Sequence, residues 1–189
     1  GSLVTITETT RTGSDSGTGG TGGPGAPGDF DVVIRGGTVF DGTGAPGKLA
    51  DVGIRAGVVE AISSSPLPVG ADTRVVEAEG RWVTPGFIDT HTHYDVEVLV
   101  SPGLKESVRH GVTTVLTGNC SISGVYSGTV DVADLFSRVE ALPRDSVLAA
   151  LEEKKTWSDP AAWRRTIENL PLGPNVASFL GHSDVRASV

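Results

Sequence analysis

The sequence contains one cysteine, no methionine and no long apolar run. A single cysteine cannot form an internal disulfide, so the chain is unlike a secreted domain stabilised by disulfides. No apolar stretch approaches the roughly 18 residues that are needed to span a bilayer, and no basic, apolar leader opens the chain. We therefore expect a cytoplasmic protein that has no membrane partner.

The sequence also lacks an excess of positive charge. Its net charge is −8 and its 15 Lys and Arg residues are scattered, which argues against nucleic acid as a partner. A hydrophobic content of 38% in 189 residues is sufficient for a buried core and predicts one domain with a small companion. Because there is no methionine and Val189 directly follows an apparent strand, we expect a fragment of a longer protein.

Two composition changes divide the N-terminal half. Residues 1–29 are rich in Gly, Ser and Thr without apolar periodicity, which predicts a disordered tail. From residue 30 to residue 84, short β-branched runs alternate with turn signals, which predicts a small antiparallel β-sheet forming part of a β-sandwich. The expected turns are at Gly36-Gly37, Asp41-Gly42, Ala56-Gly57 and Glu79-Gly80. We interpret this region as purely structural.

The run from Trp82 to Asp95 predicts one buried strand that ends in His91 and His93. Side chains two apart on a strand point the same way, so both imidazoles can serve one metal ion. A His-x-His pair is also common as a hydrogen-bonded polar pair, and the pattern alone leaves both interpretations open. The Pro85-Gly86 break before the strand and the acidic exit favour a polar site.

Two further strands are expected, at 112–117 and 175–180, and helices are expected near 102–109, 135–142, 146–154 and from Pro160. This βα alternation predicts an α/β fold with a parallel sheet. The second strand leads into Gly118-Asn119-Cys120 and the third into Gly181-His182. Because the carboxyl ends of parallel strands meet at one edge, these residues join the histidine pair there.

Imidazole and thiolate are the ligands that zinc prefers, and a catalytic zinc needs three protein ligands and an open position. Cys120 could equally be a small buried hydrophobic residue. His182 could line a pocket or bind substrate, or be satisfied by a backbone carbonyl. Asp89 could orient a ligand or bond backbone at a barrel floor, and Asn119 could steady the Cys120 loop.

Four runs together resemble one protein family. Residues 84–95, 110–115, 118–120 and 170–176 resemble the amidohydrolase superfamily, in particular its N-acyl-D-amino-acid deacylase (D-aminoacylase) branch. The resemblance implies a TIM-like (β/α)₈ metal-dependent hydrolase barrel. Residues 85–189 would supply its first three strands, and the small β-sheet would precede them.

The resemblance also implies a chemistry. One or two Zn²⁺ ions would be held by His91, His93 and Cys120, with two further histidines on the fifth and sixth strands and an aspartate base on the eighth. Those residues would lie beyond Val189, so we expect no catalytic base in this chain and no activity from it alone. The substrate would be a small N-acyl amino acid, hydrolysed to a carboxylic acid and a D-amino acid.

Three other hypotheses remain. A cyclic-amide hydrolase, such as a hydantoinase or dihydropyrimidinase, would use a carboxylated lysine on the fourth strand and give Cys120 no metal role. A non-catalytic scaffold of the same fold would bind a partner or form a homo-oligomer. A truncated product would expose an unpaired strand edge prone to association.

Overall fold

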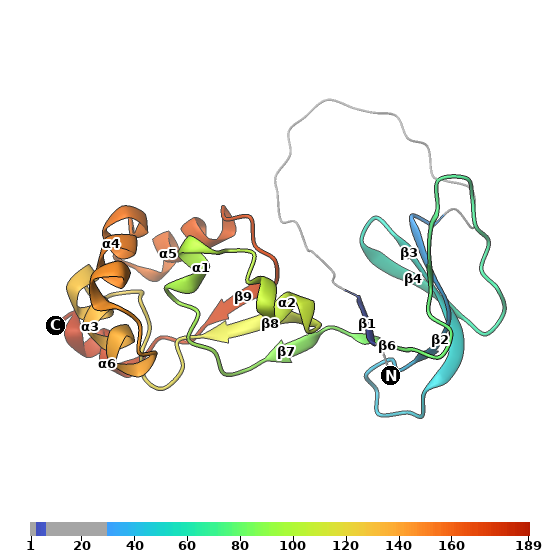
Figure 1. Cartoon of the computed structure of the whole chain (residues 1–189), viewed down its shortest axis with the longest axis horizontal. Coiled ribbons are helices and arrows are strands. Elements are labelled where there is room, and N and C mark those ends of the chain that lie inside the picture. Colours follow the sequence, from blue (N-terminus) through green and yellow to red (C-terminus); the bar gives the residue numbers. More distant parts are fainter. Residues whose placement is uncertain (1–2, 7–29) are drawn as a thin grey trace. The chain divides into compact units, whose positions relative to one another are not determined.

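The computed structural model describes residues 3–6 and 30–189, and the chain divides into two compact units, Gly1–Gly86 and Phe87–Val189 (Figure 1). The sequence predicted a domain boundary between residues 84 and 85. Within the described part of the chain, no helix has the length and apolar character that crossing a membrane requires. Each unit has its own buried cluster of apolar residues.

The first unit is a single mixed sheet in the order β1-β6-β2-β3-β4, with β5 also paired to β2. Its strands are β1 Leu3–Ile6, β2 Val32–Val39, β3 Lys48–Arg55, β4 Val58–Ser63, β5 Arg74–Glu77 and β6 Trp82–Pro85. The β2–β3 and β3–β4 pairs are antiparallel as predicted, but β5 and β6 run parallel to β2. The purely antiparallel prediction is wrong there, because residues 64–73 form a long return connection in place of a tight hairpin.

The predicted tail also differs at one place. Leu3–Ile6 forms β1 and pairs in parallel with β6, so the prediction of disorder is wrong for these four residues. The remainder of the predicted tail, residues 1–2 and 7–29, lies outside the described residues.

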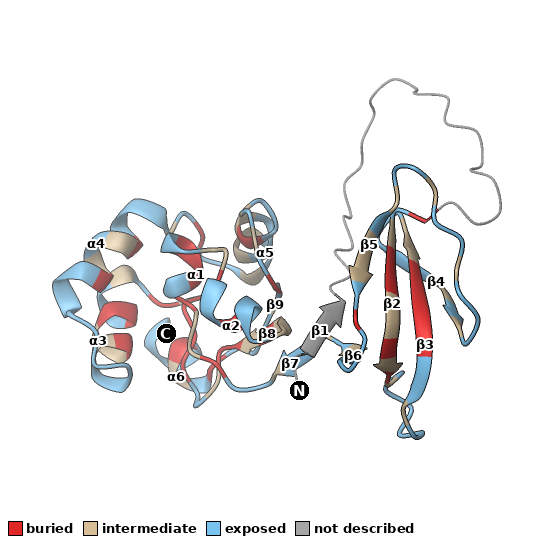
Figure 2. Ribbon diagram, turned by 45° about the vertical axis from the view of Figure 1, so that its right-hand side comes forward, coloured by how far each residue is buried: buried red, intermediate tan, exposed pale blue. Residues whose placement is uncertain are grey.

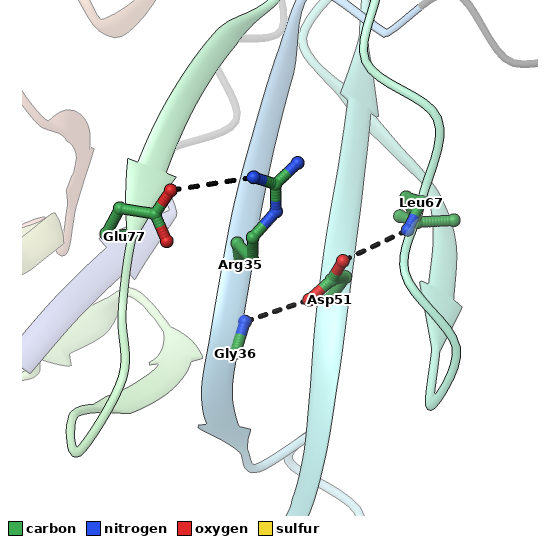
Figure 3. A network of polar contacts seen from close by, with 5 residues as sticks. All are labelled: Arg35, Gly36, Asp51, Leu67 and Glu77. Carbon is green, nitrogen blue, oxygen red and sulfur yellow. Dashed lines mark hydrogen bonds and ion pairs between the residues drawn. The ribbon is translucent and has the colours of Figure 1, made fainter.

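A buried carboxylate explains why the turn predicted at Gly36-Gly37 is wrong. Asp51, on β3, accepts hydrogen bonds from the backbone N–H groups of Gly36 at 2.8 Å and Leu67 at 3.0 Å (Figure 3). Gly36 has a φ of +69°, and the β2–β3 register shifts between Ile34 and Gly37. The glycine pair therefore makes a β-bulge within one continuous strand.

The second unit is a three-stranded parallel sheet in the order β7-β8-β9, with helices between and after the strands. Its elements are β7 Phe87–Asp89, α1 Glu97–Val100, α2 Lys105–Arg109, β8 Val112–Thr117, α3 Thr129–Val139, α4 Arg144–Lys154, α5 Pro160–Glu168, β9 Asn175–Ser178 and α6 His182–Ala187. The predicted parallel βα alternation is confirmed. Membership of these strands in a closed barrel stays a prediction.

Apolar side chains of β8 and of two helices belong to one buried cluster. Val115 on the strand, Phe136 on α3 and Leu151 on α4 are all buried in this cluster. Figure 2 shows buried stretches in red on both α3 and α4. The sequence predicted these amphipathic helices, and the expected cap of α5 is present, because the Asp159 carboxylate accepts the N–H of Ala162 at 2.9 Å. The strand thus shares one core with α3 and α4.

The single buried strand predicted over residues 82–95 is wrong. It is divided into β6 and β7, which belong to different sheets, and Phe87 and Ile88 on β7 are 47% and 62% exposed. Pro85 has no N–H to donate to a strand ladder, which accounts for the interruption. His91 and His93 consequently lie in the loop after β7 and not on the strand itself.

We expect Phe136→Ala to lower the free energy of unfolding by about 3–5 kcal/mol, because this fully buried ring would leave a cavity. Chemical denaturation of the 189-residue chain measures the change. Val139→Ala on the same helix is the control, since Val139 is 51% exposed and its truncation should alter stability by no more than about 0.5 kcal/mol. Equal losses for the two variants would contradict this description of the core.

Candidate metal centre

Two loops that begin where β7 and β8 end carry the candidate ligands. The parallel pairing aligns Asp89 with Val115, so the two strands deliver their following loops to the same edge of the sheet. One ligand atom each from His91, His93 and Cys120 lie within 4.8 Å of one another. The His91 Nε2 is 3.1 Å from the Cys120 Sγ, and the two imidazole centroids are 5.4 Å apart.

The surroundings of His93 fit a metal site. The Nδ1 atom of His93 is buried and has no hydrogen-bond partner among the described residues. Such an orphaned polar atom costs free energy unless a partner arrives, and a metal ion is one such partner. Cys120 is exposed, so the alternative that it is a buried hydrophobic residue is wrong. Two imidazoles and a thiol are a donor set suited to zinc.

The Cys120 loop turns through backbone conformations that L residues rarely adopt. Cys120 has a φ of 53° and Ser121 a φ of 70°, after Gly118 at 73°. A Cβ at Gly118 would collide with the backbone carbonyl oxygen of Phe179, so only glycine fits this close approach. Non-glycine residues in the left-handed region are held there by their surroundings, which makes the placement of the thiol a property of the whole loop.

Asp89 and Asn119 act on the backbone of the two ligand loops. The Asp89 carboxylate accepts the N–H of His91 at 3.2 Å, so it shapes the turn that presents this imidazole. The Asn119 side chain donates to the carbonyl oxygens of Thr92 at 3.3 Å and Leu116 at 2.8 Å. It thereby joins the histidine loop to the end of β8.

Sequence reasoning missed Thr92. This buried residue between the histidines donates both its N–H, at 3.1 Å, and its hydroxyl, at 2.7 Å, to the carbonyl oxygen of Leu116. The available signal was the alternation of side chains in an extended segment, which turns the middle residue of His-x-His away from the two imidazoles. The two hydrogen bonds of this buried residue therefore join the histidine loop to β8.

His182 stands apart from this group. It was expected at the end of the third strand, but β9 ends at Ser178 and His182 is the exposed first residue of α6. The predicted extension of β9 to Leu180 is wrong because the chain bends to bond the Cys120 loop: the N–H of Gly181 donates to the Ser123 hydroxyl at 3.0 Å. A substrate-binding role for His182 stays a prediction.

Asp95 is buried close to the same loop. Its carboxylate accepts the N–H of Gly118 at 3.3 Å. Burial raises the pKa of Asp95 to about 7, and the negative charge of Asp184 adds to the effect, although hydrogen bonds from backbone N–H groups oppose it. The Asp95 carboxyl group therefore ionises near neutral pH, next to the Gly118 backbone that leads into the Cys120 loop.

The sequence model of the amidohydrolase family matches residues 74–186, a span that includes all three candidate ligands. The chain belongs to the amidohydrolase family. An uncharacterised protein of Mycobacterium tuberculosis is 59% identical over 160 residues, which is 85% of this chain and 26% of that protein. The N-acyl-D-glutamate deacylase of Alcaligenes xylosoxydans xylosoxydans is 37% identical over 158 residues, or 82% of this chain and 29% of the enzyme.

Solved structures of amidohydrolases support the same relationship. A D-aminoacylase described with a binuclear metal centre has a TM-score of 0.68 and 35% identity, covering 85% of this chain and 31% of that one. The N-acyl-D-glutamate deacylase of Bordetella bronchiseptica, in complex with zinc and a phosphonate inhibitor, has a TM-score of 0.67, 32% identity and the same coverage. This amidohydrolase chain thus spans less than a third of the length of these relatives. The predicted resemblance to deacylases is confirmed.

We expect the metal-free chain to lose stability as pH rises from about 4 to about 7, through Asp95. The unfolded state releases this proton near the ordinary pKa of 3.8, whereas the folded state holds it until about 7. The unfolded state therefore binds fewer protons in this window. Each pKa unit corresponds to about 1.4 kcal/mol, so the loss is on the order of a few kcal/mol.

Urea denaturation at a series of pH values in the presence of a chelator measures this dependence. Asp95→Asn cannot ionise and should flatten the decline between pH 4 and pH 7, while Asp89→Asn, which alters a half-buried carboxylate at the end of β7, should leave it in place. An unchanged pH profile in Asp95→Asn would show that another group is responsible.

Proposed function

We propose that the gene product carrying this chain is a metal-dependent hydrolase of carbon–nitrogen amide bonds, most specifically an N-acyl-D-amino-acid deacylase. The observation that carries the proposal is the meeting of His91, His93 and Cys120 within 4.8 Å at the carboxyl edge of a parallel sheet. The similarity to deacylases along 82–85% of the chain supports the choice of reaction. Zn²⁺, as one or two ions, is the proposed cofactor.

In this proposal the two imidazoles and the thiolate hold the metal, while Asp89 and Asn119 fix the loops that carry them. A bound zinc ion supplies Lewis acidity toward the amide carbonyl and lowers the pKa of its water toward 7. His93 contributes one ring nitrogen as a ligand. The family resemblance assigns proton transfer to an aspartate of the eighth barrel strand, beyond Val189.

The position of Cys120 favours a deacylase over a cyclic-amide hydrolase. In the cyclic-amide alternative this cysteine has no metal role, yet its exposed sulfur lies 3.1 Å from His91 Nε2. A thiol this close to an imidazole, within a group of three candidate ligands, suits the role of a metal ligand better than that of a side chain that only fills a core. The proposed architecture is the first three strands of a (β/α)₈ barrel, and the proposed substrate is a small N-acyl amino acid.

We expect the 189-residue chain to bind Co²⁺ as a spectroscopic substitute for zinc and to show thiolate-to-metal charge-transfer absorption. Cys120→Ser should abolish that absorption, and His93→Gln should weaken binding at least about 10-fold, since even residues that only support ligands change affinity by 10- to 100-fold. The matched control is His110→Gln, an exposed histidine at the end of α2. Binding that persists without Cys120 and without His93 would contradict the assigned ligand set.

Activity is tested in the full-length gene product with a panel of N-acetyl-D-amino acids and their L enantiomers. We expect hydrolysis of D substrates, and we expect Cys120→Ala to reduce kcat/KM by about 100-fold or more, because Lewis-acid stabilisation is worth several kcal/mol. His110→Gln should retain the wild-type rate. A Cys120→Ala enzyme with full amidase activity would exclude the cysteine as a metal ligand, and exclusive hydrolysis of cyclic amides would favour the alternative.

A further inference from the structure

Asp184, on α6, is a fully buried carboxylate that receives hydrogen bonds from one short segment of chain. Its donors are the hydroxyl of Ser123 at 2.7 Å, the N–H groups of Val125 at 3.0 Å and Tyr126 at 3.0 Å, and both the N–H at 2.7 Å and the hydroxyl at 2.5 Å of Ser127. Every donor lies between β8 and α3. The carboxylate therefore organises residues 123–127 as a unit.

Ser183 on α6 and Trp157 also form hydrogen bonds with the loop between β8 and α3. The N–H of Ser183 donates to the carbonyl oxygen of Ser121 at 2.8 Å and to its hydroxyl at 3.0 Å. The indole N–H of Trp157 donates to the carbonyl oxygen of Gly124 at 2.9 Å. These contacts begin at the residue that directly follows Cys120, so the left-handed turn that places the thiol is continuous with the anchored segment.

Asp184 is built to remain an anion in this place. Burial by itself raises the pKa of a carboxyl group, but the hydrogen bonds from Ser127, Ser123 and the backbone N–H groups of Tyr126 and Ser127 outweigh it, and the pKa of Asp184 is lowered below its ordinary value. Removing this buried charge or its donors would strongly destabilise the fold, because the groups that remain would be buried without partners. Such a group holds its donors in one arrangement.

We propose that Asp184 is a positioning residue for the metal site, which holds the loop after β8 in the conformation that presents the Cys120 thiol to His91 and His93. The inference rests on the proposed function, because it assumes that these three residues bind metal. Asp184 touches none of the reacting groups in this proposal. It acts through the segment 121–127, and the neighbouring Asn119 constrains only the start of that loop, through Leu116 and Thr92.

The test is Co²⁺ titration of the 189-residue chain carrying Asp184→Asn, which keeps the shape of the side chain but removes its charge and one acceptor oxygen. We expect a rise of about 10- to 100-fold in the Co²⁺ dissociation constant and a weaker thiolate charge-transfer band at saturating metal. Ser127→Ala removes one donor only and should give a smaller change in the same direction. It also covers the case in which Asp184→Asn fails to fold.

Asp51→Asn is the matched control, since Asp51 is also a buried carboxylate that accepts backbone N–H groups, but on β3 of the other unit. It should lower the unfolding midpoint as Asp184→Asn does, yet leave Co²⁺ affinity and the charge-transfer band unchanged. Wild-type affinity and an unchanged band in both Asp184→Asn and Ser127→Ala would overturn the inference alone. Failure of the wild-type chain to bind Co²⁺ would overturn the proposed metal site and this inference with it.

Discussion

The carbonyl oxygen of Leu116, at the end of β8, is the point on which the candidate site depends. It accepts hydrogen bonds from the N–H and the hydroxyl of Thr92 and from the side chain of Asn119. One oxygen thus joins the histidine loop, the cysteine loop and the central strand. Because Val115 of that strand belongs to the same buried cluster as residues of α3 and α4, this core supports the relative placement of the imidazoles and the thiol.

Each unit contains a buried carboxylate that accepts backbone N–H groups, and the two carboxylates stabilise different kinds of structure. In the first unit Asp51 stabilises a bulge in a sheet, and in the second Asp184 stabilises a loop beside candidate ligands. Both use backbone N–H groups as donors, which satisfies the groups that an irregular chain would otherwise leave unpaired. The same physical device serves architecture in one unit and, in our proposal, the metal site in the other.

Local sequence patterns were sufficient for β8 and for the ligand candidates. The β-branched run before Gly118 predicted the strand, and residue chemistry singled out His91, His93 and Cys120, whose ligand atoms then proved to lie together. Two of the predictions that failed depended on partners distant in the sequence. The bulge at Gly36 requires Asp51, and the early end of β9 requires the loop after Cys120, so neither could be found from its own neighbourhood.

The partnership between Ser123 and Asp184 spans 61 residues, and this separation has a consequence for the newly made chain. At a synthesis rate of about 5–20 residues per second, roughly 3 to 12 s pass between the synthesis of Ser123 and the synthesis of Asp184. Contacts this distant in sequence also form late, since loop closure must precede them. The loop that carries Cys120 therefore becomes ordered only after α6 has been synthesised. The candidate ligands are thus synthesised before their site can form.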